Sequence, residues 1–317
     1  FLFSIILLID IFDNSFKKSL TNFISFSKAE TLKQSLKIFL LYLILTFSIF
    51  VVLNLLNIRA FNSFNLAMSI ISSGGFLPTN SLSNILLSNF QIITFSLLML
   101  TSFFSIFLSY NLIFIKNRNL NFFNEDIHLL FYFIFLLTIF FIFFNLDNNF
   151  SELLLSLTSS ISNIGFSLDN NSSNLSFIFL ILLIIGGSFF STSSGIRFLK
   201  IYSLFKYSIN EILSYSKPKN IYINKHLFSK ESFKLNEIYK YFLSIIIFVI
   251  SLFFLAFLLT LSGIDFEASF KLSILTLMNT VNSSMYGLSD FSFYDLHSFT
   301  KYCLIFFMII GRIELLT

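Results

Sequence analysis

Long apolar runs without charged residues constrain this chain more than any other feature. The clearest of them are residues 38–58, 90–115 and 242–264. A helix needs about 20 such residues to cross a bilayer. Because runs of alternating polarity, as in a membrane barrel, are absent, we expect an all-α polytopic membrane protein. Three more spans are expected at residues 129–146, 175–185 with its continuation, and 303–310.

The composition supports this class and argues against others. Of the 317 residues, 56% are hydrophobic and 11% are charged, whereas about 25% are charged in a typical soluble domain. The single Cys303 excludes an internal disulfide, and His128, His226 and His297 are too far apart in sequence to form a ligand-spaced pair. No phosphate-binding glycine motif occurs. We therefore expect a protein that is not an enzyme, binds no cofactor and has no nucleic-acid partner, with lipid around its helices.

Basic residues mark one side of the membrane. They gather at residues 17–37, 116–118 and 197–240, and the intervening loops are mostly acidic. Lys and Arg favour cytoplasmic loops, so the acidic loops should face outside, where they would attract cations. Ordinary solvated loop charge is the alternative interpretation.

A short segment recurs between the spans, within residues 61–80, 150–170 and 266–290. The apolar part of the first has about 13 residues, or roughly 20 Å of helix, which is too short to cross. The three segments therefore predict re-entrant helices that end in pore loops, arranged as an internal repeat. We expect the three closing glycines to lie at one depth around one axis, with Met285 as the alternative in the last loop. Each glycine follows a serine by three residues, in the pairs Ser72 and Gly75, Ser162 and Gly165, and Ser284 and Gly287.

Such loops suit the binding of a monovalent cation. Non-helical backbone at membrane depth persists where it is buried in protein or lines a water-filled path. Its carbonyl oxygens can replace the hydration shell of an ion such as K⁺, and the negative ends of the short helices point at the same place. K⁺ at this filter is the only metal ion expected, and the predicted filter residues are Ser73, Gly74, Gly75, Phe76, Asn163, Ile164, Gly165, Phe166, Met285, Tyr286, Gly287 and Leu288.

The stretch "GGSFFSTSSGIRFLK" follows the apolar run at 175–185 and predicts a broken helix. Gly186 and Gly187 each lower helix propensity by about 1 kcal/mol relative to Ala. The Ser/Thr side chains that follow can satisfy the freed backbone groups, while Arg197 and Lys200 are expected to anchor the cytoplasmic end. A close helix crossing through small residues is the alternative. The remaining residues of the predicted break are Ser188, Ser191, Thr192, Ser193, Ser194 and Gly195.

Several of these motifs together resemble the membrane subunit of the Trk/Ktr/HKT superfamily of potassium transporters, most closely the bacterial TrkH type. They are "KAETLKQSLKIFLLYLILT", "GGFLPTN", "IGFSLDN", "IGGSFFSTSSGIRFLK" and "GRIELLT". The resemblance implies four helix–pore loop–helix repeats around a pseudo-fourfold ion pore. It makes residues 1–12 the tail of a first repeat, and the chain a fragment that lacks that repeat and the C-terminal end. The other repeats would be residues 13–120, 121–200 and 236–317, with a cytoplasmic basic loop at 201–235.

The resemblance also implies a function and partners. It implies potassium uptake across the cell inner membrane, with the 186–195 loop as an intramembrane gate and Arg312 as part of the barrier; a snorkelling Arg312 is the alternative. It implies a homodimer and a cytosolic nucleotide-binding regulatory ring of the TrkA or KtrA type. Phe190 and Ser194 depart from the family signature, which has glycine at both positions. Sodium or mixed monovalent-cation transport stays open, as does an unrelated secondary transporter with broken helices, although that class predicts inverted repeats.

Overall fold

The computed structural model describes residues 28–79, 81–105, 120–143, 150–168, 175–188, 191–215, 235–288, 291, 293–294 and 296–312. Helices account for the regular structure of these residues, apart from one isolated bridge between Ile185 and Ile196. The expected tail at residues 1–12 lies outside the described residues.

The helices form three units, numbered here as the second, third and fourth, and each has a long helix, a short helix with its loop, and a further helix, which in the third unit is interrupted. The second unit comprises α3 (Lys28–Leu55), α4 (Ala60–Ser72) and α5 (Asn89–Phe103). The third comprises α7 (Leu120–Phe143), α8 (Phe150–Ile161), α9 (Ser176–Ile184) and α10 (Phe198–Ser214). The fourth comprises α11 (Leu235–Leu261), α12 (Phe266–Met278), the 3₁₀ turn η3 (Ser284–Tyr286) and α13 (Ser298–Arg312).

The lengths of these helices follow the apolar pattern of the sequence. Two helices in the described part are long and apolar enough to cross a membrane, over Glu125–Ile142 and Ile238–Leu261. The short helices α4, α8 and α12 have 13, 12 and 13 residues, as the repeat predicts. The outer face of α11 is apolar and exposed, with Ile250 at 61% and Phe257 at 57% exposure. A face of this kind suits contact with lipid better than contact with water.

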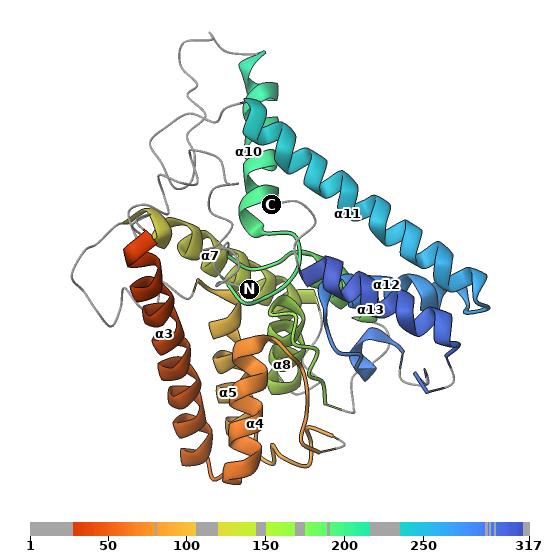
Figure 1. Cartoon of the computed structure of the whole chain (residues 1–317). Coiled ribbons are helices and arrows are strands. Elements are labelled where there is room, and N and C mark those ends of the chain that lie inside the picture. Colours follow the sequence, from red (N-terminus) through yellow and green to blue (C-terminus); the bar gives the residue numbers. More distant parts are fainter. Residues whose placement is uncertain are drawn as a thin grey trace.

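Two hydrophobic cores hold the units together. One lies among α3, α4 and α5 and also takes in Leu155, Ile164 and Phe166 of the third unit. The other joins α7, α8, α9, α11, α12 and α13. Helix α8 packs between α5 and α9, and its residues 154–161 are all buried. In Figure 1, α3, α4 and α5 lie side by side, and α12 and α13 lie together beneath α11.

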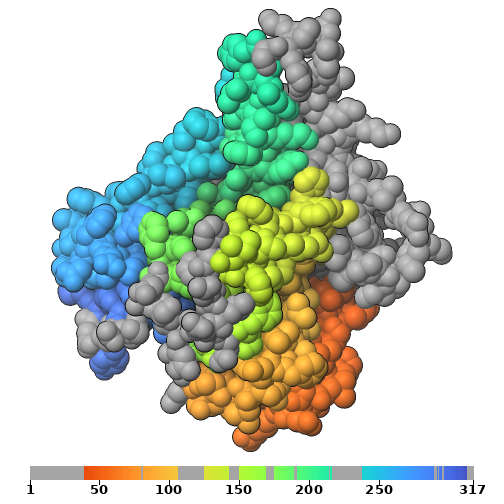
Figure 2. Space-filling view, turned by 180° about the vertical axis from the view of Figure 1, so that it is seen from behind, coloured from red at the N-terminus to blue at the C-terminus, as the bar shows by residue number. Residues whose placement is uncertain are grey.

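The three units occupy separate regions of the molecular surface. Seen from behind, the red and orange second unit, the yellow α7 and the blue fourth unit occupy different sectors (Figure 2). The loops that follow the short helices α4, α8 and α12 lie against one another.

Two boundaries differ from those that the sequence predicts. Helix α5 ends at Phe103, where Phe104 is extended, rather than running to residue 115; residues 106–119 lie outside the described part. Residues 201–214 belong to α10 and are not a loop. Their spacing of apolar residues favours an amphipathic helix, which a search for basic residues alone does not detect. The rest of the predicted basic loop, 216–234, is not described.

Candidate functional site

The three short helices end with the same backbone motif. Ser73, Asn163 and Asn279 each adopt a left-handed conformation, with φ of 50°, 57° and 53°. Each donates its N–H to the carbonyl three residues earlier, and the next residue donates to the carbonyl five residues earlier, as in Ser73 N to Ile70 O (3.1 Å) and Gly74 N to Ser69 O (2.9 Å). This is the Schellman pattern of helix termination. It defines three equivalent loops: the second loop (residues 73–76), the third loop (163–166) and the fourth loop (279–282).

The second and third loops need glycine two residues after the left-handed residue. Gly75 has φ of +68° and Gly165 has φ of +90°, where a side chain is strained. Space is also lacking. A Cβ at Gly75 would overlap the carbonyl oxygen of Ile164, and a Cβ at Gly165 would overlap that of Val281. The fourth loop therefore places the carbonyl of Val281 against Gly165 of the third loop, and the third loop places the carbonyl of Ile164 against Gly75 of the second loop.

The fourth loop differs from the prediction. Helix α12 ends at Met278, so the residue equivalent to Gly75 and Gly165 is Val281 and not Gly287 or Met285. Asn279 takes the left-handed position, which Asn tolerates better than most residues. The Ser-x-x-Gly spacing misplaced the loop because Ser284 and Gly287 belong to a separate 3₁₀ turn further along the chain. Val281 has no positive φ, and its Cγ2 would lie 2.8 Å from a Cβ at Gly75.

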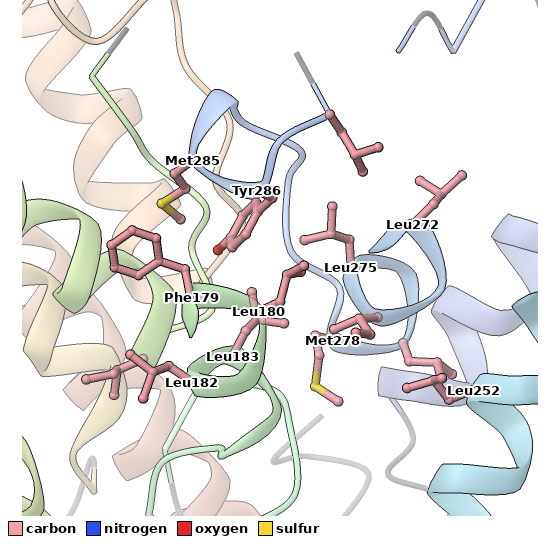
Figure 3. Close-up of a cluster of buried hydrophobic side chains, with 14 of the residues drawn as sticks. Phe179, Leu180, Leu182, Leu183, Leu252, Leu272, Leu275, Met278, Met285 and Tyr286 are labelled. Carbon is pink, nitrogen blue, oxygen red and sulfur yellow. The ribbon is translucent and has the colours of Figure 1, made fainter. Parts of the chain in front are cut away.

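Residues Met285 to Leu288 pack in the apolar core instead. Met285 and Tyr286 are both 0% exposed. Figure 3 shows their side chains beside Phe179 and Leu180 of α9. They stabilise the fold, and the predicted equivalence of these residues with the second and third loops does not hold.

The carbonyl of Gly287 already has a cationic partner. The Lys271 ammonium donates to Gly287 O at 3.4 Å and pairs with Glu267 at 2.6 Å. The hydrogen bond from Lys271, together with its charge, lowers the pKa of the Glu267 carboxyl. A free cation would have to compete with this ammonium, so the chemistry of the turn is unsuited to an ion site.

A cavity of about 760 Å³ lies between the second and fourth loops. Ser73 and Gly74 of the second loop, Thr280 and Asn282 of the fourth loop, and Arg312 all line it. The hydroxyl, amide and backbone groups of the two loops suit a hydrated cation. The remaining lining residues are Ser72, Phe76, Leu272, Leu275, Thr276, Asn279, Val281, Phe293, Leu296, Lys301, Leu304, Ile305 and Met308.

The helix of the third unit is interrupted between α9 and α10, as the glycine pair and the Ser/Thr cluster predict. The break segment comprises residues 185–188 and 191–197; Phe189 and Phe190 are not described. Its two arms are joined by hydrogen bonds from Gly186 N to Ile196 O (2.9 Å) and from Ile196 N to Ile184 O (3.0 Å). Gly195, with φ of +97°, turns the chain back toward Ile196. The two described arms of the break segment therefore lie side by side, as in a hairpin.

Serine side chains satisfy the backbone of the break segment. Gly187 N donates to Ser193 Oγ at 2.9 Å, and Ser191 Oγ donates to Ser188 O at 2.7 Å. The Ser191 and Ser193 hydroxyls are 2.9 Å apart. All three serines are buried, so these bonds replace water that the interior does not supply.

The break segment also docks on the end of α5. Ser188 N donates to Phe103 O at 3.0 Å, while Thr192 N and Ser193 N both donate to Ser102 O at 3.2 Å. The last carbonyls of a helix have no partner within the helix. The segment thus caps α5 from a position about 90 residues further along the chain, and the two elements are held together.

Arg197 lies at the centre of the break segment. The sequence predicts that it anchors the cytoplasmic end of the helix, and this prediction is wrong. The Arg197 side chain is buried, at 4% exposure. Nη1 donates to Ser188 O (3.0 Å), Ser191 Oγ (3.0 Å), Ser193 O (3.2 Å) and Ser191 O (3.3 Å). One buried guanidinium therefore satisfies three carbonyl oxygens and one hydroxyl of the break segment. Lys200 is buried as well, at 9% exposure, and is also not a surface anchor.

Arg312 connects the break segment to the second loop. Nη1 donates to Ser194 Oγ at 2.9 Å, and Nη2 donates to Ser72 O at 3.0 Å. Nearby, the hydroxyls of Ser73 and Thr192 are 3.3 Å apart. The half-buried guanidinium is therefore bonded to two other segments of the protein, which disfavours the snorkelling alternative. The neighbouring Glu314 is not described.

Sequence reasoning missed two parts of this arrangement. The residues of the fourth loop, Thr280 to Asn282, were passed over because the loop carries no glycine. The signal that could have found them is Asn279 directly after the apolar run of α12, since Asn often ends a helix in place of glycine. The acceptors on α5 gave no local signal.

Comparisons with known proteins agree with this architecture. Residues 148–317 match the family described as "TrkH: Cation transport protein". No curated protein sequence matches the chain. The crystal structure of the potassium transporter TrkH from Vibrio parahaemolyticus is similar, with a TM-score of 0.80 and 18% sequence identity, over 98% of this chain and 67% of that one. This likeness supports the fold. Since the family match covers more than half of the chain, the protein belongs to the TrkH family of membrane cation transporters, and it is not an enzyme.

Proposed function

We propose that this protein carries potassium into the cell through the path between its re-entrant loops. The observation that carries the proposal is the shared ending of α4, α8 and α12. Three helix C-termini, each with a partial negative charge, converge on loops that are rich in backbone carbonyls. A monovalent cation is the ligand that such a group of dipoles stabilises, because it needs neutral oxygens and no fixed counter-charge.

The break segment is the gate of this path. It crosses below the loops, is bound to the end of α5 and contacts the second loop through Thr192 and Ser73. Arg312 adds a positive charge to the lining of the cavity, which opposes the passage of cations while the side chain stays there. Movement of the segment and of Arg312 would remove both barriers.

Sodium or mixed-cation transport is the second candidate, and Val281 is the observation that favours it. A loop without a positive φ at this position presents its carbonyls in a different direction from the other two. Fewer equivalent oxygens around the ion would weaken discrimination between K⁺ and Na⁺.

The setting of the protein is part of the proposal. We place it in the cell inner membrane as a homodimer, with a cytosolic nucleotide-binding ring as its regulator. The exposed apolar faces of α11 support the membrane location. Co-purification of the ring with the intact protein, and a dimer mass by light scattering in detergent, are the expected results; a monomer that is fully active alone would contradict both.

Uptake by a potassium-uptake-deficient cell tests the function. The intact protein should restore growth at low potassium, and Gly165→Ala should abolish this because its Cβ would overlap Val281 O. Gly263→Ala is the matched control: Gly263 also has a positive φ, of +91°, yet has nothing within 4 Å of an added Cβ. Restoration by Gly165→Ala at the wild-type level, in equal amounts of membrane protein, would contradict the proposed path. An excess of Na⁺ that blocks potassium uptake would favour the second candidate.

A further inference from the structure

The bond between Ser194 and Arg312 joins three separate parts of the protein at one guanidinium. These parts are the break segment, the end of α4 at Ser72, and α13 itself. Ser194 is 7% exposed, whereas Arg312 is half-buried and lines the cavity, so the bond between them is partly shielded from water. A charge-assisted hydrogen bond is about twice as strong as one between neutral groups.

Arg312 is held firmly on its other side. Gly311 lies against Leu277 of α12 so closely that a Cβ would overlap the Leu277 carbonyl oxygen. Asn279 Nδ2 donates to Met308 O at 3.0 Å. The end of α13 is therefore fixed to the end of α12, and the position of the guanidinium is set by the fourth loop.

The acceptor on Ser72 suits a cation. Ser72 O is the last carbonyl of α4, where the helix dipole is negative. The Ser73–Thr192 contact lies beside it as a second link between the same two segments. The gate is thus connected to the end of α4 at Ser72 and to the second loop at Ser73, and these two residues are neighbours in the chain.

We propose that Ser194 is a positioning residue that latches the closed gate to Arg312, and through Arg312 to the second loop. The inference rests on the proposed function. The Ser194 hydroxyl is the acceptor of the bond from Arg312, and alanine or glycine at this position would have none. The closed gate therefore has a bond that must break before the break segment can leave the end of α4. Opening of the gate and release of the second loop are one event.

Flux measurements on three variants test the latch. Ser194→Ala and Ser194→Gly should both raise the basal potassium flux of the intact protein in liposomes, by about three- to tenfold, because a charge-assisted hydrogen bond is then missing from the closed state only. Ser194→Thr keeps a hydroxyl and should stay near the wild-type flux. An increase in the glycine variant alone would overturn the latch, since it would show that backbone flexibility is responsible.

A double-mutant cycle separates the latch from a merely structural effect. Arg312→Gln alone should raise flux, and adding Ser194→Ala to it should raise flux no further, because the bond is already lost. Independent, additive effects would overturn the proposal.

Hydrogen–deuterium exchange gives a readout that does not depend on transport. Amides of residues 191–197 should exchange faster in Ser194→Ala than in the wild type, while those of α11 stay unchanged. Unchanged exchange of residues 191–197 would overturn the latch even if the protein transports potassium. Faster exchange in a protein that carries no potassium would uphold the latch and refute the proposed function.

Discussion

Replacing Arg197 by methionine should release the gate without unfolding the protein. The change removes a donor that four buried acceptors share, but Ser188 O and Ser191 Oγ keep other partners. Ser191 O and Ser193 O lose the only partner that the described structure gives them. An unsatisfied buried acceptor costs about 1–3 kcal/mol, so the two together cost about 2–6 kcal/mol.

A smaller effect acts in the opposite direction. Arg197 directly precedes α10, where a positive charge is unfavourable by about 0.3–1 kcal/mol, and methionine removes that charge. The net loss for the closed conformation is then about 1–6 kcal/mol. Even the lower value shifts the balance between closed and open gate about fivefold, because 1.4 kcal/mol is a factor of ten.

The assay is potassium flux into liposomes that contain the intact protein, with size-exclusion chromatography to confirm folding. Arg197→Met should raise basal flux severalfold. Arg197→Lys is the control, and its flux should stay closer to wild type than that of Arg197→Met, because one nitrogen donates all four bonds and an ammonium also donates from one nitrogen. A folded Arg197→Met protein with wild-type flux would refute the role of Arg197 in holding the gate.

Three further substitutions test the loops and the contact between α12 and α13. Val281→Gly should increase the preference for K⁺ over Na⁺ in competition assays, because the fourth loop could then adopt the backbone of the other two; an unchanged preference would show that Val281 does not limit selectivity. Asn279→Ala should lower the midpoint of thermal unfolding more than Asn279→Gly, since both lose the bond to Met308 O but only alanine is strained at a φ of 53°, by about 1–2 kcal/mol; equal shifts would argue against the left-handed conformation. Gly311→Ala should push α13 from α12 and raise basal flux as Ser194→Ala does, and a normal flux would mean that Arg312 does not depend on this contact.

The sequence alone was sufficient to predict most of the helices and the break. Apolar runs, and the short length of the segments between them, predicted α4, α8 and α12, because both signals are local and periodic. Gly186 and Gly187 marked the interruption for the same reason. These features depend on the local apolar pattern and helix propensity of a segment, and not on its tertiary contacts.

The fourth loop and the partners of Arg197 could not be predicted in this way. Asn279 ends α12 in a conformation that glycine usually provides, so counting glycines moved the loop to Gly287. Arg197 is typical of a cytoplasmic flank by its position, but it is buried because the turn supplies enough carbonyls to replace water. Such a result depends on tertiary contacts that sequence spacing does not encode.

The most direct test of the ion path is to locate the ion itself. Crystals of the intact protein, grown with Tl⁺ in place of K⁺, should give anomalous density beside the carbonyls of the second, third and fourth loops, and an excess of K⁺ should remove it. Density at the Gly287 turn, or no density near Gly75 and Gly165, would contradict the account that these loops form the path for potassium.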